Sequence, residues 1–235
     1  MLFKYSRFLF RLMAATLLAC LSFAGRTQAN GLLYDPEPPV DSAYVRVILA
    51  SRTGVVDIQV DERPRIQKLI AGEASEYMVL TAGKHTVTVS PAGKSAAILS
   101  TKIDVVQGRA MTVAFRELKS DTVPVIFEDK ANSNKLKALL AVYHLDSKGG
   151  ALDVLTADGS TSVFSGVTYG ASSFIQVNPI AIDLIATTAG EKAPRGRTSL
   201  VMKQGGTYSL ILSSGTDGKL LVRSVQNRIE RYTGK

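Results

Sequence analysis

Few side chains in this 235-residue sequence are suited to nucleophilic or general-base catalysis. A serine hydrolase or acyltransferase activates its serine through a positioned histidine, and the sequence has two histidines, His85 and His144. Each lies in a segment with β-strand character, and the sequence lacks Gly-x-Ser-x-Gly and Ser-x-x-Lys motifs. We therefore predict no catalytic residues and no enzymatic activity. The alternative is an acetyltransferase or esterase that pairs a serine with one of these histidines.

Metal-binding and cofactor-binding residue types are also not arranged in a known motif. The sequence has a single cysteine, no His-Glu-x-x-His and no Asp-x-Asp-x-Asp loop. Gly205-Gly206 lies between two apolar segments instead of preceding a helix, so it does not have the context of a phosphate-binding loop. We predict no metal and no cofactor.

Surface recognition is the remaining chemistry that the side chains could perform. Tyrosine combines an apolar ring with a polar hydroxyl, and four tyrosines are candidate contacts: Tyr34, Tyr77, Tyr169 and Tyr232. The alternative is that each covers its own domain. As contacts with a partner protein we single out Leu33, Tyr34, Tyr44 and Arg46. Tryptophan, which forms many carbohydrate-binding platforms, is absent.

The N-terminal 29 residues predict export. Lys4, Arg7 and Arg11 precede an apolar run over residues 12–24, and Thr27-Gln28-Ala29 offers a signal-peptidase site after Ala29. The predicted location is the periplasm. The alternative is lipidation at Cys20, which follows Leu17-Leu18-Ala19.

Cleavage after Ala29 would remove four basic residues, which lowers the net charge from +8 to about +4. A mildly basic protein does not have the charge of a nucleic-acid binder. It would suit an acidic partner, either a uronic-acid polymer or an acidic protein face.

The remaining chain divides into segments of different composition. Residues 30–43 form a proline-rich extended arm, and residues 44–117 have a β pattern. A polar connection over residues 118–137 precedes a second β region, residues 138–227. The basic tail, residues 228–235, is expected to be loose.

Turn signals between short alternating segments favour β-sandwiches. Gln107-Gly108 and Asp158-Gly159 are predicted to be hairpin turns, and residues 67–79 could be helix or strand. Ile103 to Phe115 aligns without a gap on Leu200 to Leu212, with Gln-Gly at the same place. The predicted fold is all-β, with two β-sandwich domains of similar topology joined by the short polar connection after a cleaved signal peptide.

Several segments resemble a known family. They are Gly31-Leu-Leu-Tyr-Asp-Pro-Glu-Pro-Pro, Ser42-Ala-Tyr-Val-Arg-Val, Thr156-Ala-Asp-Gly-Ser-Thr and Val177-Asn-Pro. In these segments and in its order of signal, arm and two β halves, the chain resembles the AlgF family, accessory proteins of alginate O-acetylation.

The resemblance implies a periplasmic, non-catalytic adaptor that is required for O-acetylation of an exopolysaccharide. Such an adaptor would bridge membrane-associated acetyl-transfer proteins and a periplasmic acetyltransferase. The alternative function is a module that binds an acidic exopolysaccharide directly.

Overall fold

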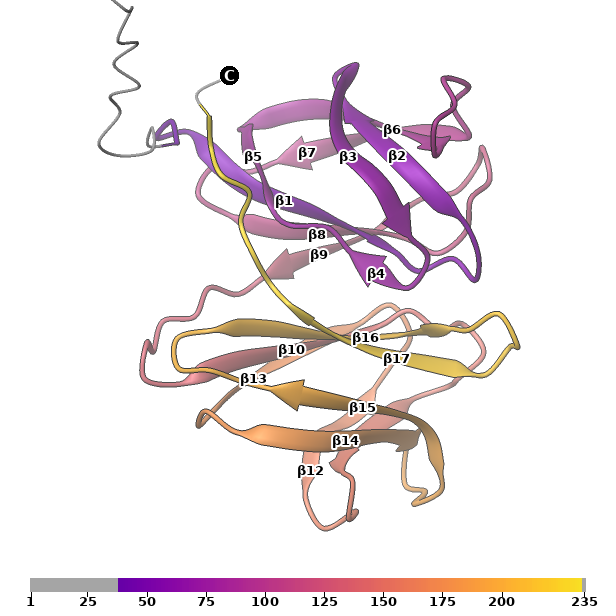
Figure 1. Cartoon of the computed structure of the whole chain (residues 1–235), viewed down its shortest axis with the longest axis vertical. Helices are drawn as coiled ribbons and strands as arrows, with labels where there is room; N and C mark the ends of the chain where they lie inside the picture. Colours follow the sequence, from indigo (N-terminus) through magenta and orange to yellow (C-terminus); the bar gives the residue numbers. More distant parts are fainter. Residues whose placement is uncertain (1–37, 234–235) are drawn as a thin grey trace, which may run out of the picture. The chain divides into compact units, whose positions relative to one another are not determined.

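The computed structural model describes residues 38–233, and this part of the chain is built of 17 β-strands (Figure 1). No helix that could cross a membrane occurs within it. The predicted signal peptide and most of the proline-rich arm lie outside the described residues. The all-β prediction is confirmed.

The first sandwich consists of two sheets. One has the strand order β4-β1-β8-β9, with β5 also paired to β1, and the other has the order β3-β2-β6-β7. The bounds of these strands are β1 (Ser42–Leu49), β2 (Val55–Val60), β3 (Arg63–Ile70), β4 (Glu73–Ala74), β5 (Met78–Thr81), β6 (Gly83–Pro91), β7 (Leu99–Val105), β8 (Ala110–Phe115) and β9 (Val125–Asp129).

The second sandwich also consists of two sheets, with the strand orders β13-β10-β16-β17 and β12-β11-β14-β15. The bounds of its strands are β10 (Ala138–His144), β11 (Leu152–Thr156), β12 (Ser162–Val167), β13 (Ser172–Val177), β14 (Ala181–Thr188), β15 (Pro194–Val201), β16 (Thr207–Ser214) and β17 (Leu220–Gln226).

The two sandwiches share one topology. In each sandwich the first strand pairs in parallel with a strand late in the same sandwich. In the first sandwich β1 pairs with β8, and in the second β10 pairs with β16. The second strand of each pairs with two antiparallel neighbours, β2 with β3 and β6, and β11 with β12 and β14. The prediction of two sandwiches of similar topology is therefore confirmed.

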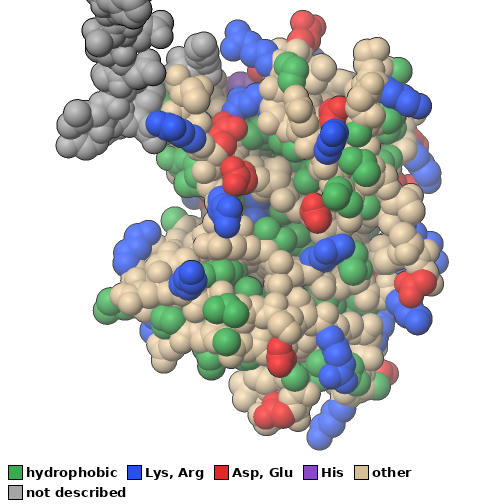
Figure 2. All heavy atoms as spheres, viewed as in Figure 1, with side chains coloured by type: hydrophobic (Ala, Val, Ile, Leu, Met, Phe, Trp, Pro, Cys, Tyr) green, Lys and Arg blue, Asp and Glu red, His purple; other side chains and the backbone are tan. Residues whose placement is uncertain are grey.

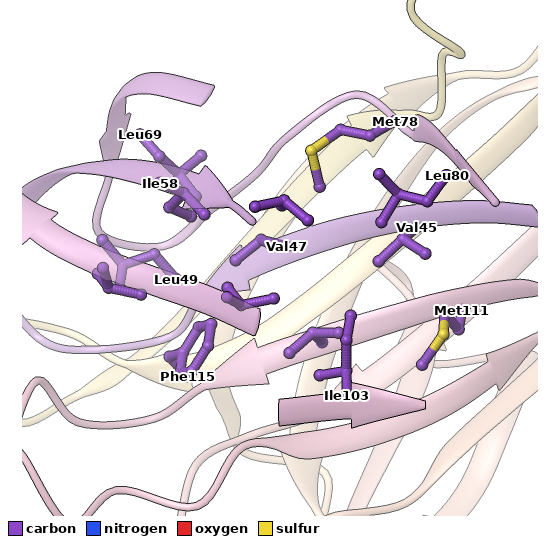
Figure 3. Close-up of a cluster of buried hydrophobic side chains, with 14 of the residues drawn as sticks. Val45, Val47, Leu49, Ile58, Leu69, Met78, Leu80, Ile103, Met111 and Phe115 are labelled. Carbon is purple, nitrogen blue, oxygen red and sulfur yellow. The ribbon is translucent and has the colours of Figure 1, made fainter. Parts of the chain in front are cut away.

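Each sandwich has its own apolar core between its two sheets. In the first, alternate residues of β1 (Val45, Val47 and Leu49) pack with Met78, Phe115 and others, as Figure 3 shows. An equivalent cluster in the second sandwich includes Leu140, Leu184 and Leu210. Burial of these apolar side chains supplies the main favourable contribution to folding.

A third apolar cluster joins the two sandwiches. It contains Ile48 and Ala114 of the first sandwich and Tyr143 and Ile211 of the second. We call the two sheets that contribute to it, β4-β1-β8-β9 and β13-β10-β16-β17, the inner sheets. Because β1 is buried on both faces, its sequence is almost continuously apolar.

The two predicted hairpins have different outcomes. Asp158-Gly159 joins β11 to β12, which are antiparallel neighbours, so this hairpin is confirmed. The Gln107-Gly108 hairpin is wrong, because β7 and β8 belong to different sheets. This turn, like the one at Gly205, carries the chain from one sheet to the other. Gly108 and Gly205 have φ values of 69° and 72°, which glycine adopts without strain.

Three segments either decide between alternatives or differ from what the sequence predicts. Residues 67–79 contain the end of β3, all of β4 and the first residues of β5, so the helical alternative is wrong. Strand β9 lies inside the polar segment 118–137. The chain after β17 returns to the first sandwich, where Tyr77 and Ile229 form a parallel bridge. We call residues 227–230 the C-terminal strap.

Candidate functional site

Arg46 lies at the centre of the contact between the two inner sheets, with 0% of its surface exposed. Its side chain points away from the first core because it alternates with Val45 and Val47 along β1. Arg46 Nε donates to Thr112 Oγ1 at 2.8 Å within the same sheet. Arg46 Nη2 donates to Ser209 Oγ of the second sandwich at 2.9 Å. One side chain thus links both inner sheets.

Asp129 is connected to Arg46 through Thr112, whose hydroxyl donates to Asp129 Oδ2 at 2.6 Å. Tyr77 and Tyr143 donate to the two oxygens of Asp129 at 2.8 Å and 2.6 Å. The rings of these tyrosines lie 4.7 Å and 5.1 Å from the Arg46 guanidinium, within range of cation–π attraction. Asp129 and the two rings together compensate a buried positive charge.

Both tyrosines of this network are neutral donors. Burial, with the charge of Asp129 acting in the same direction, raises the pKa of Tyr143 to about 12. Burial likewise raises the pKa of Tyr77 above its usual value. The hydroxyl groups therefore stay protonated at physiological pH and continue to donate to Asp129.

The C-terminal strap completes the contact between the sandwiches. Asn227 Oδ1 accepts hydrogen bonds from Arg46 Nη1 at 2.7 Å and from Ser209 Oγ at 2.8 Å. Tyr77 N donates to the Arg228 carbonyl at 2.8 Å, and Glu230 N donates to the Tyr77 carbonyl at 2.9 Å. The strap continues the chain from β17 of the second sandwich and contacts the region around β5 of the first.

A cleft of about 1100 Å³ is lined by loops of both sandwiches. We call it the loop cleft; its main lining residues are Ser51, Arg52, Thr53, Arg116, Glu117, Leu118, Lys119, Asp121, Val123, Leu145, Ser147, Lys148, Tyr169 and Ser214. Arg116, which follows β8, donates to the Tyr169 hydroxyl of the β12–β13 connection and lies 5.1 Å from its ring. This contact spans the cleft from one sandwich to the other.

His85 is hydrogen-bonded through both ring nitrogens. Nδ1 lies 2.6 Å from Asp61 Oδ2, and Nε2 lies 2.9 Å from the Thr81 carbonyl oxygen. Both ring nitrogens are therefore directed at these two oxygens and not at a serine hydroxyl. The hydrogen bond from the Thr86 amide and that from His85 lower the pKa of Asp61.

His144 is fully buried on β10, and its ring nitrogens are also engaged. Nε2 lies 2.7 Å from the Gly150 carbonyl oxygen, and Nδ1 accepts from the Asp146 amide at 3.3 Å. Burial lowers the pKa of His144, so the ring is neutral. In neither histidine does the geometry resemble a serine-activating base.

The residues predicted to contact a partner lie in different environments. Leu33 and Tyr34 are outside the described residues. Tyr44 is half-buried on β1. Arg46 is fully buried, because the second sandwich covers it. Among the candidate tyrosines, Tyr169 lies at the loop cleft with 36% of its surface exposed.

Asp129 and Arg116 were missed by the sequence analysis. Asp129 lies in the segment interpreted as a connection, and Arg116 directly follows a strand, where a charged residue is common. An arginine within an almost continuously apolar strand is the one sequence signal for the network, because such a charge requires buried partners.

The chain is similar to known proteins over most of its length. A family described as "Domain of unknown function (DUF4397)" matches residues 43–155, which include the first sandwich. The protein described as "Alginate biosynthesis protein AlgF" from Pseudomonas putida is 26% identical over 210 residues, 88% of this chain and 90% of that protein. The protein of the same description from Pseudomonas aeruginosa is 27% identical over 212 residues, 89% of each chain.

The chain resembles AlgF. The predicted family resemblance is therefore confirmed. A solved structure of the C-terminal domain of AlgF from P. aeruginosa is 28% identical and covers 40% of this chain and 100% of that domain, with a TM-score of 0.33. Because the two AlgF relatives are covered over about nine-tenths of their length, the resemblance extends across both sandwiches.

Proposed function

We propose that this protein is a non-catalytic adaptor in the O-acetylation of alginate. It bridges membrane-associated acetyl-transfer proteins and a periplasmic acetyltransferase. The observation that carries the proposal is the similarity to alginate biosynthesis proteins named AlgF over nearly the whole chain. The resemblance to the AlgF family and the contact between the two sandwiches support the adaptor role.

The contact between the sandwiches supports an adaptor role. A protein that brings two partners together benefits from a fixed geometry between its binding surfaces, because less conformational entropy is then lost on assembly. Here the third apolar cluster and the Arg46 network tie the two sandwiches together. The engaged nitrogens of His85 and His144 argue against catalysis by either histidine.

The proposed location is the periplasm, reached through a signal peptide that is cleaved after Ala29. N-terminal sequencing of the protein purified from the periplasmic fraction would give Asn30 as the first residue. A lipid-modified Cys20 at the N-terminus would contradict this processing and place the protein at a membrane.

Pull-down tests the adaptor role directly. The full chain, produced with its own export signal and a C-terminal tag, is expected to retain the alginate acetylation proteins of the same organism. In a strain that lacks the protein, the acetyl content of the secreted polymer should fall, and the variant H85Q/H144Q should restore it if it folds. Failure to retain any of these proteins would overturn the proposal, and folded H85Q/H144Q that cannot restore acetylation would point to catalysis.

A second function, direct binding of the acidic polysaccharide, is favoured by the excess of basic residues in the loop cleft. The face in Figure 2 gives it less support, since basic and acidic side chains are interspersed there without a continuous basic patch. Binding of polymannuronate that weakens as salt is raised would support this function. Absence of binding at low salt would remove it.

A further inference from the structure

The loop cleft is formed by connections that gather at one end of both sandwiches. Arg52 comes from the β1–β2 connection and Arg116 from the β8–β9 connection of the first sandwich. Lys148 and Tyr169 come from the β10–β11 and β12–β13 connections of the second. Connecting loops on a rigid β scaffold commonly form recognition surfaces, because they can vary while the sheets hold them in place. A molecule in this cleft would contact both sandwiches.

The charge of the loop cleft is positive. Its lining includes four basic residues but only two acidic ones. The basic residues are Arg52, Arg116, Lys119 and Lys148, and the acidic residues are Glu117 and Asp121. Lys119 forms an ion pair with Glu117 at 2.6 Å, and this interaction lowers the pKa of Glu117. The other three basic residues thus outnumber the remaining acidic residue, and the cleft attracts an anionic ligand.

Arg116 has donor capacity that its own chain does not use. Its Nε is buried without a hydrogen-bond partner among the described residues. Its Nη1 donates to Tyr169, a neutral hydroxyl that does not balance the guanidinium charge. A guanidinium presents its donors in a planar fork that matches a carboxylate. A carboxylate is therefore the ligand group that best complements Arg116.

The apolar lining distinguishes a protein ligand from a sugar polymer. Val123, which lines the cleft, is 73% exposed, and Leu118, a second aliphatic lining residue, is half-buried. Sugar rings bind best to the free faces of aromatic side chains. Tyr169 is the one aromatic residue among those that line the cleft, and the Arg116 guanidinium already lies over its ring. Aliphatic side chains interspersed with carboxylates fit this lining better than a uronic-acid chain does.

We propose that the loop cleft binds an acidic segment of a partner protein in which carboxylates alternate with aliphatic side chains. This assignment rests on the proposed adaptor function and names the chemistry of one of its partners. The carboxylates would pair with Arg116, Arg52 and Lys148, and the aliphatic groups would cover Val123 and Leu118. Because both sandwiches contribute, binding requires them to be held in their observed contact.

Fluorescence anisotropy with a labelled peptide of alternating glutamate and valine tests the proposal. The peptide should bind the full mature chain saturably at low salt, and the matched glutamine–valine peptide should not. The variant R52E/K148E changes one exposed residue of each sandwich and should bind about tenfold more weakly, because two attractive charge pairs become repulsive. The control K102E/K192E changes the net charge equally, on exposed residues outside the cleft lining, and should bind like the wild type.

Other results would overturn the assignment. Equal weakening by both variants would mean a non-specific charge effect, and no peptide binding at low salt would remove the site. If polymannuronate binds, is lost in R52E/K148E and the peptide does not bind, the cleft takes polysaccharide. In the pull-down, a folded R52E/K148E that still retains every partner would reject the cleft while leaving the adaptor function intact. Wild-type protein that retains no partner would reject the adaptor function instead.

Discussion

An arginine without exposed surface must have its charge compensated and its donors occupied, since a buried ion is costly in a medium of low polarity. Arg46 meets this requirement with partners from three places: its own sheet, the other inner sheet and the C-terminal strap. These partners are up to 181 residues distant in the sequence. The requirements of one buried residue therefore fix the positions of several distant segments.

Substitution R46M is expected to lower the free energy of unfolding by about 3 kcal/mol, because it leaves Asp129 without a compensating positive charge. Urea denaturation followed by circular dichroism measures the change. R223M, at an exposed position of β17, serves as the control and should change stability little. The double variant R46M/D129N should lose less than the sum of the single variants. Strict additivity would show that the two residues are not coupled.

Burial of neutral His144 predicts a pH dependence of stability. Because its folded-state pKa lies below the unfolded value, the unfolded chain binds the proton first as pH falls. The free energy of unfolding should therefore decrease from about pH 7 to pH 5, across the unfolded pKa of about 6.5. Asp146 and Arg195 are the charged neighbours and act on the pKa in opposite directions. In H144Q this contribution to the slope should be missing; an unchanged slope would contradict it.

At the residue scale, the alternation of β1 correctly places Arg46 on the face opposite Val45 and Val47. It does not predict that a second sandwich covers that face, because a strand pattern contains no information about distant partners. For the same reason Asp129 could be read as part of a polar connection. Its partners Thr112 and Tyr143 become neighbours through tertiary packing.

At the scale of elements, the sequence predicts strands with clear alternation well, such as β2, whose buried Val56, Ile58 and Val60 alternate with polar residues. It performs less well where pairing decides the outcome. The Gln107-Gly108 turn has hairpin chemistry, but the strands on either side pair with other partners. Strand β3 has four charged or amide residues, so its alternation is obscured.

The C-terminal strap is the element whose role is least evident from the sequence, because a short basic tail usually has no fixed structure. Glu230 pairs with Arg65 and accepts from Val79 N at 3.0 Å. E230A should lower the free energy of unfolding by about 1 to 2 kcal/mol, since it leaves the Val79 amide without this partner.

Chemical denaturation and amide hydrogen exchange measure the effect of E230A. Exchange at Tyr77 and Val79 should accelerate, because both amides donate to the strap. The matched control E191A, in the exposed β14–β15 connection, should leave both stability and exchange unchanged. Equal effects of the two substitutions would show that the strap does not stabilise the first sandwich.

For the whole molecule, the apolar cluster and the buried network between the inner sheets predict coupled unfolding. The wild-type protein should show one calorimetric transition, with van't Hoff and calorimetric enthalpies that agree. The variant R46M/N227A should show two transitions, because it removes polar links between the sandwiches. It leaves the apolar core of each sandwich intact. Two separate transitions in the wild type would mean that the sandwiches are thermodynamically independent.

The strap also has a consequence for biosynthesis. Translation completes β1 and β8 long before the ribosome adds Ser209 and Asn227, which lie 163 and 181 residues after Arg46. Until those residues emerge, a folded first sandwich would present to water Ile48, Ala114 and an arginine that lacks two of its hydrogen-bond acceptors. Residues 227–230 thus complete the contact only after both sandwiches have been synthesised, and a nascent chain that stalls before them would be a natural client for chaperones.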